Sequence, residues 1–154
     1  MKLGIIGQGF VGSAVSNGFS KDTERFIVDP KFTDNTLQDL VNWEAEIIFV
    51  CVPTPQQDTH LDVDTYIARE VLRELDELEY KGVVVVKSTI TPHHLKQFKT
   101  LFSTLRIVYN PEFLTEANSL QDFINPNMQI LGGELHDCIE AVSYTHLRAH
   151  ETFA

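Results

Sequence analysis

The first twelve residues, MKLGIIGQGFVG (1–12), decide the fold. Residues 3–6 are a short apolar run that predicts a buried strand, and the run leads directly into Gly7, Gly9 and Gly12. Apolar residues then recur at helical spacing: Val11, Ala14, Val15 and Phe19. A strand, a glycine turn and a helix in this order form the context in which G-x-G-x-x-G predicts dinucleotide binding.

Each glycine of this motif has a distinct expected role. Gly7 makes the tight turn, Gly9 lets the backbone approach a pyrophosphate, and Gly12 allows the helix and the strand to pack closely. The helix N-terminus offers N–H groups and a partial positive charge to the phosphates. We therefore expect the whole turn to bind the cofactor: Gly7, Gln8, Gly9, Phe10, Val11 and Gly12.

An acidic residue about twenty positions after the first glycine tests the motif. Residues 25–29 are a β-rich run that ends in Asp29. A carboxylate there can accept both ribose hydroxyls of the adenosine half and would repel a 2′-phosphate, which favours NAD over NADP. Lys31 lies close enough to weaken this preference. The alternative interpretation of Asp29 is an ordinary surface aspartate after a strand.

Length and composition indicate one ordinary globular domain, with 154 residues, of which 43% are apolar and 22% charged. A net charge of −10 argues against a nucleic-acid-binding protein. No apolar run approaches the roughly 20 residues of a membrane span, and the N-terminus does not resemble a signal peptide. Two cysteines form no disulfide framework, and we expect a cytoplasmic protein without a metal site.

Further strands are predicted at intervals along the chain. Nearly unbroken apolar runs at residues 46–52, 83–86 and 106–109 are typical of strands covered on both faces, as in a parallel sheet. Residues 128–131, closed by two glycines, predict one more strand. Because helical segments separate the strands, we expect an α/β fold with a single Rossmann-type doubly wound parallel sheet. Cys51 lies in an apolar run and is interpreted as a small core residue.

Helical periodicity predicts the segments between the strands. A short helix is expected over residues 35–41 and a longer one over residues 62–80. One face of the longer helix should be buried: Ile67, Val71, Leu75 and Leu78. Thr91 begins a further helix because a proline follows it. His93 and His94 lie in its first turn and are interpreted as exposed polar residues.

Chemically distinctive residues follow the ends of the predicted strands. They are the glycine motif, Asp29, residues 53–55, residues 88–89 and residues 110–112. Any one of these groups could be turn or capping chemistry alone. In an open parallel sheet, however, ligands bind outside the carboxyl ends of the strands. We therefore expect this edge to hold a cofactor with a substrate beside it.

Four stretches, in this order, resemble a known family: IGQGFVG (6–12), FVCVPTP (49–55), VVKSTITP (85–92) and NPEFLTEANSLQDFINPNMQILGG (110–133). Together they are similar to the N-terminal domain of the UDP-glucose/GDP-mannose dehydrogenase family, over residues 1 to about 141. The resemblance implies oxidation of the 6-hydroxyl of a nucleotide sugar such as UDP-glucose to a carboxylate, with two NAD per sugar. It also implies a cysteine thiohemiacetal, then a thioester that water hydrolyses, and a homodimeric full-length form.

The resemblance assigns roles to individual residues. Glu112 is implied as the acid/base group for the chemistry of water and thioester, and Thr89 is implied to position the water or the substrate oxygen. Further implied cofactor contacts are Val52, Pro53, Thr54, Ser88, Thr89 and Glu116. The implied substrate contacts are Glu112, Phe113, Leu114 and Glu116. The alternative interpretation of Glu112 is a capping residue in a tight turn.

The sequence also departs from the family pattern. The segment between Asp29 and Ile47 is shorter than usual, and Asn127 and Met128 replace an acidic-then-basic pair. The family's nucleophilic cysteine, with its lysine and asparagine, belongs to a second domain that these 154 residues do not include. Cys138 lies in the wrong place to replace that cysteine. We therefore expect an enzyme fragment that is inactive alone.

Residues 143–154, SYTHLRAHETFA, are expected to be a non-native tail. Leu135, Ile139 and Val142 predict an amphipathic helix that this stretch does not continue. The stretch resembles a translated sequencing adapter, and such segments are excluded from fold reasoning. We therefore expect the Rossmann domain to cover residues 1–142.

Two other functions stay open at this point. One is a freestanding NAD-binding module without catalysis, which would require a natural end near residue 142. The substrate-type loop NPEFLTE (110–116) argues against it. The other is a dehydrogenase of the β-hydroxyacid type with the same nucleotide domain.

Overall fold

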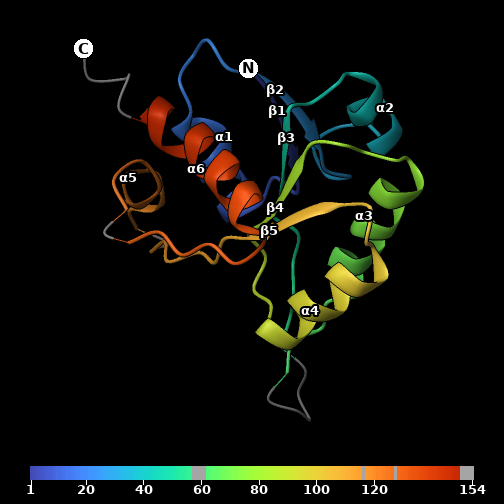
Figure 1. The fold of residues 1–154 in the computed structure, drawn as a ribbon. Helices are drawn as coiled ribbons and strands as arrows, with labels where there is room; N and C mark the ends of the chain where they lie inside the picture. The colour runs from blue at the N-terminus through green and yellow to red at the C-terminus, as the bar shows by residue number, and fades with distance from the viewer. Residues whose placement is uncertain (57–61, 116, 127, 150–154) are drawn as a thin grey trace.

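The computed structural model describes residues 1–56, 62–115, 117–126 and 128–149, the last five of these by their backbone alone. Within these residues, a five-stranded parallel sheet forms the centre, in the order β2-β1-β3-β4-β5 (Figure 1). Its strands are β1 (Lys2–Ile6), β2 (Glu24–Val28), β3 (Ile47–Val50), β4 (Val83–Val86) and β5 (Arg106–Tyr109). The predicted doubly wound parallel sheet is confirmed.

Helices cover both faces of the sheet. They are α1 (Phe10–Gly18), α2 (Leu37–Asn42), α3 (Tyr66–Glu77), α4 (Pro92–Leu101), α5 (Ser119–Ile124) and α6 (Leu135–Ala149). Figure 1 shows α1, α5 and α6 on one side of the sheet and α2, α3 and α4 on the other. None of the helices in the described part of the chain is long and apolar enough to cross a membrane.

The sheet is buried on both faces, which explains its unbroken apolar runs. In β3, Ile47 and Phe49 contribute to the core beneath α1 and α6. The alternate residues Ile48 and Val50 contribute to the core beneath α2, α3 and α4. All four side chains are fully buried. Cys51, which follows them, is also buried, as predicted.

The first turn of α4 contains a buried histidine. The backbone N–H of His94 donates to Thr91 Oγ1 at 3.3 Å, and the His94 ring stacks on Phe98. His94 is 8% exposed, whereas His93 points outward. The prediction that both histidines are exposed is therefore wrong for His94. The capping box holds its ring against Phe98 of the same helix.

Helix α3 is shorter than predicted and presents a different face to the sheet. It covers Tyr66–Glu77, and its buried residues are Ala68, Leu72 and Leu75. Ile67, expected in the core, is 45% exposed. The prediction is wrong there because the apolar stripe of α3 is wider than its contact with the sheet. Its outer edge lines a pocket instead, as described below.

Residues 128–131 do not form the predicted strand. The returning chain instead meets β5 at a single antiparallel bridge between Tyr109 and Gly132. The Tyr109 N–H donates to the Gly132 carbonyl at 2.7 Å, and the Gly132 N–H donates back at 2.8 Å. The next glycine, Gly133, allows this approach, since a Cβ there would lie 3.0 Å from the Ile107 carbonyl oxygen.

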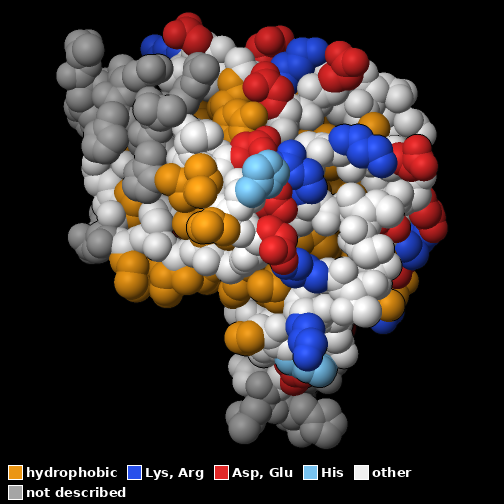
Figure 2. All heavy atoms as spheres, in the orientation of Figure 1, with side chains coloured by type: hydrophobic (Ala, Val, Ile, Leu, Met, Phe, Trp, Pro, Cys, Tyr) orange, Lys and Arg blue, Asp and Glu red, His pale blue; other side chains and the backbone are white. Residues whose placement is uncertain are grey.

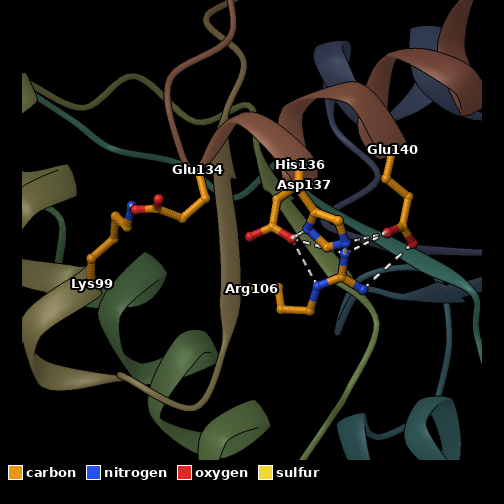
Figure 3. Close-up of polar contacts among 6 residues, drawn as sticks. All are labelled: Lys99, Arg106, Glu134, His136, Asp137 and Glu140. Atoms are coloured by element: carbon orange, nitrogen blue, oxygen red, sulfur yellow. Dashed lines mark hydrogen bonds and ion pairs between the residues drawn. The ribbon is translucent and has the colours of Figure 1, made fainter.

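Helix α6 is oriented by a cluster of charged side chains (Figure 3). Arg106 of β5 donates to Asp137 Oδ1 at 2.8 Å and pairs with Glu140, and these hydrogen bonds raise the pKa of Arg106. A second ion pair joins Lys99 of α4 to Glu134 at 2.6 Å. Both ion pairs hold the start of α6 near the edge of the sheet where the strands begin. The glycine turn lies at the opposite edge.

This orientation overturns the predicted amphipathic face of α6. Leu135 and Ile139 are 77% and 62% exposed, while Asp137 and Ala141 are buried. Apolar side chains accordingly gather on the surface over α6 and the segment before it (Figure 2). The helix also continues past Ser143 to Ala149, contrary to the expectation that it stops there. The Arg106 cluster, rather than the apolar spacing, decides which side of α6 faces the sheet.

Candidate cofactor and substrate site

The glycine turn combines a closely packed interior with an open exterior. Gly7 has φ +90°, and a Cβ there would lie 2.6 Å from the Cys51 carbonyl oxygen. A Cβ on Gly12 would lie 1.8 Å from the Gly7 carbonyl oxygen. A Cβ on Gly9 would meet nothing within 4 Å. The backbone at Gly9 is therefore open to a ligand, and the N-terminus of α1 faces the same space.

Asp29 connects the glycine turn to the end of β2. Its Oδ2 accepts the Gln8 N–H at 2.6 Å, and its Oδ1 accepts the Lys31 N–H at 2.8 Å. The carboxylate is buried, with 9% of the residue exposed. Each carboxylate oxygen can accept more than one hydrogen bond, so Asp29 can still receive hydroxyl donors. The side chain of Lys31 is exposed beside it.

A largely apolar pocket of about 490 Å³ opens beside Asp29, and we call it the outer pocket. It is lined by Ile6, Gly7, Gly9, Val28, Asp29, Pro30, Lys31, Phe32, Leu37, Cys51, Val52, Pro53, Ile67 and Val71. Phe32 is 65% exposed. A flat apolar ring suits such walls, since they bury a ligand without demanding polar partners. Phe32, Ile67 and Val71 were not predicted as site residues, because their apolar character is typical of core positions.

A second pocket of about 340 Å³, the middle pocket, continues the same edge of the sheet. It is lined by Gly9, Phe10, Val11, Cys51, Val52, Pro53, Thr54, Lys87, Ser88, Thr89 and Glu112. Ser88 is buried and donates from Oγ to the Val52 carbonyl at 2.7 Å, whereas Thr89 is exposed. The two pockets share four residues and are therefore adjacent, and we call the row of pockets along this edge the trough.

A third pocket of about 290 Å³, the loop pocket, lies at the far end of the trough. It is lined by Lys87, Pro111, Glu112, Phe113, Thr115, Asp122, Phe123, Asn125, Pro126, Met128 and Gln129. Thr115 closes its loop by donating from its N–H and its Oγ1 to Asp122 Oδ2, at 2.9 and 2.7 Å. These two hydrogen bonds lower the pKa of Asp122.

Lys87 and Glu112 line both the middle pocket and the loop pocket. Lys87 Nζ lies 2.7 Å from Glu112 Oε2 and 2.9 Å from Asn110 Oδ1. It also lies 5.7 Å from the centre of the Phe123 ring. Sequence reasoning missed Lys87, although a lysine directly after four buried valines is an available signal, since it must find a partner or reach solvent.

The structure thus brings most of the predicted site residues to one edge. Phe113 lines the loop pocket, and Leu114 follows it, half-buried in the same loop. Gly12 lies beneath the trough rather than in its wall. Glu116, predicted to contact cofactor and substrate, lies outside the described residues.

The two cysteines of the sequence are unsuited to covalent chemistry. Cys51 is buried, and this burial raises the pKa of its thiol to about 12. Cys138 lies in the first turn of α6, and its pKa is also raised, chiefly by burial. A thiolate is the reactive form of cysteine, so the raised pKa disfavours reaction at both side chains, most strongly at the buried Cys51.

Three features define a dinucleotide-binding domain of the dehydrogenase class. They are a glycine turn after the first strand of a parallel sheet, an acidic residue at the end of the next strand, and a trough between them. The sequence profile of the UDP-glucose/GDP-mannose dehydrogenase family, NAD binding domain, matches residues 29–149. The chain therefore belongs to this family, and its cofactor is NAD. The open backbone at Gly9 and the apolar outer pocket fit that cofactor.

Comparisons with individual proteins agree with the family. The chain is 26% identical over 163 residues to a UDP-glucose 6-dehydrogenase of Campylobacter jejuni, covering 86% of this chain and 42% of that protein. The structure is similar to a UDP-glucose dehydrogenase from the archaeon Pyrobaculum islandicum, with a TM-score of 0.77 and 18% identity, over 95% of this chain and 44% of that one. The chain thus spans less than half the length of these relatives.

The fold itself is shared more widely. A 3-hydroxyisobutyrate dehydrogenase of Mycobacterium tuberculosis matches with a TM-score of 0.65 and 13% identity, over 94% of this chain and 50% of that one. A β-hydroxyacid dehydrogenase and a nucleotide-sugar dehydrogenase therefore have the same nucleotide domain. The fold alone does not separate the two functions.

Proposed function

We propose that this chain is the NAD-binding part of a nucleotide-sugar 6-dehydrogenase, which oxidises UDP-glucose or a related UDP- or GDP-sugar to the uronate with two NAD per sugar. The observation that carries the proposal is the row of adjacent pockets along this edge, in which the middle pocket and the loop pocket share Lys87 and Glu112. A module that only bound NAD would need no such second pocket.

The glycine turn and the N-terminus of α1 bind the diphosphate of NAD in this proposal. Asp29 accepts the ribose hydroxyls of the adenosine half, and the outer pocket takes the adenine ring between apolar walls. Val52, Pro53 and Thr54 line the middle of the trough, with Ser88 and Thr89 beside the nicotinamide. When bound there, NAD accepts a hydride from the sugar carbon.

Glu112 is the proposed acid/base residue. Its Oε1 accepts the Phe113 N–H at 3.0 Å and its Oε2 faces Lys87, so both oxygens have fixed positions at the edge of the loop pocket. A carboxylate held in this way can take a proton from a sugar hydroxyl or from water. Thr89 positions the water or the substrate oxygen, while Phe113 and Leu114 contact the nucleotide sugar.

The nucleophilic cysteine of the proposed reaction comes from outside these 154 residues. Burial raises the pKa of the Cys51 thiol to about 12, and Cys138 lines none of the three pockets, so neither is suited to replace it. We accordingly expect the 154-residue chain to bind NAD and to turn nothing over. Reduction of NAD by this chain alone with UDP-glucose would contradict the assignment.

The function is tested with protein expressed from the full reading frame of the native gene. NADH formation is measured with UDP-glucose, GDP-mannose and 3-hydroxyisobutyrate as alternative substrates. The proposal predicts two NADH per uronate with one of the nucleotide sugars. Turnover of 3-hydroxyisobutyrate would identify a β-hydroxyacid dehydrogenase. NAD binding without turnover of any of the three would identify a cofactor-binding module.

A further inference from the structure

Lys87 is a buried cation at the junction of two pockets. It follows β4 directly, and 3% of its side chain is exposed. An ammonium group removed from water costs several kcal/mol unless an opposite charge and hydrogen bonds compensate it. The compensation here comes from Glu112, Asn110 and the ring face of Phe123, all from the segment after β5.

The ion pair fixes the position of the Glu112 side chain and also compensates the buried charge of Lys87. The Glu112 side chain is 16% exposed, and its Oε2 has no partner other than Lys87 within hydrogen-bonding distance among the described residues. Its Oε1 is held by the Phe113 N–H. Without the ammonium group, Oε2 would therefore be a buried negative charge without compensation.

Stability alone does not explain this arrangement. Apolar residues of similar volume often replace a buried ion pair without loss of stability. The strand that precedes Lys87 shows the apolar alternative, since β4 consists of four buried valines. Lys87 instead places its charge at the boundary between the middle pocket and the loop pocket.

We propose that Lys87 is a positioning residue, which holds the Glu112 carboxylate at the junction of the two pockets. The inference rests on the proposed function, since it concerns the acid/base role of Glu112. A proton from the sugar hydroxyl or from water moves to the carboxylate, and the Lys87 ammonium group keeps all of its protons. The same positive charge offsets the charge of Glu112 in the middle pocket, which in the proposed function holds part of an anionic dinucleotide.

The ion pair is tested directly by NMR of the lysine ammonium groups in the ¹⁵N-labelled 154-residue chain. A buried, paired ammonium group exchanges its protons slowly and gives a signal that exposed lysines lack. We expect one such signal to disappear in Lys87→Met and to shift in Glu112→Gln. Lys99→Met, which removes a lysine paired on the surface, should leave it unchanged. A Lys87 signal that is absent, or that does not respond to Glu112→Gln, would overturn the proposal.

The effect on the cofactor is tested by fluorescence titration with NADH. Lys87→Met should weaken NADH binding roughly tenfold, because an uncompensated carboxylate then faces the anionic cofactor. Lys87→Arg should bind within threefold of wild type. The double variant Lys87→Met/Glu112→Gln contains no unpaired charge and should also bind within threefold. It keeps the test informative if Lys87→Met alone does not fold.

The titration separates the two proposals. If wild type does not bind NADH, the cofactor role within the proposed function fails, while the ammonium signal still reports whether Lys87 pairs with Glu112. If wild type binds and Lys87→Met binds equally well, the positioning role fails alone. A double variant as weak as Lys87→Met would also overturn it, since Lys87 would then not act through Glu112.

Discussion

The outer pocket and the loop pocket lie at the same edge of the sheet, but they are constructed in different ways. The outer pocket is built where β1, β2 and β3 end, and the register of these strands brings its backbone segments together. The loop pocket is built mainly from one connection, residues 111–129, and it depends on side-chain contacts. The outer pocket therefore gathers segments between residues 6 and 71 through the register of the sheet, whereas the loop pocket combines one connection with Lys87.

The loop pocket depends on α1 through one aromatic residue. Phe123 of α5 packs against the ring of Phe19, with ring centres 5.8 Å apart, and lies directly over Gly18. It also presents its face to Lys87. Helix α1 therefore supports both pockets. The backbone at its N-terminal end borders the outer pocket, and its C-terminal end contacts Phe123, which lines the loop pocket.

The largest expected effect comes from the glycine turn. Gly12→Ala places a Cβ 1.8 Å from a backbone oxygen, so the turn and α1 must separate. We expect a loss of stability above the roughly 1–3 kcal/mol that is usual for overpacking, together with loss of NAD binding. Chemical denaturation and calorimetric titration measure both quantities.

Gly9→Ala is the matched control for that substitution. A Cβ at Gly9 meets nothing within 4 Å in the protein, so the free energy of unfolding should change by less than about 1 kcal/mol. NAD binding should nevertheless weaken, because the Cβ occupies the approach to the diphosphate. Equal NAD affinity of Gly9→Ala and wild type would show that the cofactor does not pass over this turn.

A smaller effect is expected from the aromatic contact beneath the loop pocket. Phe123→Ala removes a half-buried ring from Phe19 and Gly18 and should cost about 3 kcal/mol of stability. The folded variant should keep its NAD affinity, because the outer pocket does not depend on α5. Leu120→Ala, on the exposed side of the same helix, is the control and should change stability little. An equal loss in both variants would contradict the account.

The smallest effect concerns pH. Hydrogen bonds from Thr115 hold the pKa of Asp122 below its usual value, so their contribution is complete above the ordinary aspartate pKa of about 4. It is lost as the pH falls through the lowered pKa of the folded protein. Asp122→Asn should therefore lower the unfolding temperature at neutral pH, and this difference should disappear in strong acid.

Asp39 provides the comparison on the other side of the molecule. Its pKa is lowered by Thr36 in the same way, within the capping box of α2. Asp39→Asn should therefore show the same pH dependence of stability as Asp122→Asn. Only Asp122→Asn should alter the amide NMR signals of the loop pocket. A pH-independent difference in either variant would show that the hydrogen bonds do not depend on the carboxylate charge.

Local sequence was sufficient for the five strands of the sheet and for the glycine turn. The valines of β4 and the residues of β3 are buried on both faces, so their apolar runs predict strands without ambiguity. The glycine turn was predictable because its three glycines and Asp29 belong to one continuous strand–turn–helix–strand segment, β1 to the end of β2. These features require no knowledge of distant contacts.

Three positions that the sequence misplaced or missed share one physical cause, which is that an apolar or charged side chain does not specify its partner. Ile67 belongs to the apolar stripe of α3 but lines the outer pocket. Leu135 has core-like spacing, yet Arg106 turns α6 so that Leu135 faces outward. Lys87 finds its partner Glu112 only because β4 and β5 are neighbours in the sheet. Pairings between distant segments decide all three positions.

The most direct test of the account is chemical-shift mapping of the ¹⁵N-labelled chain, first with NAD and then with UDP-glucose. We predict that NAD shifts the backbone amides of the glycine turn, Asp29, Phe32, Thr54 and Ser88, and that UDP-glucose then shifts those of Phe113 and Thr115. NAD-induced shifts confined to other surfaces, or UDP-glucose shifts that avoid the loop pocket, would contradict a single trough that holds cofactor and substrate.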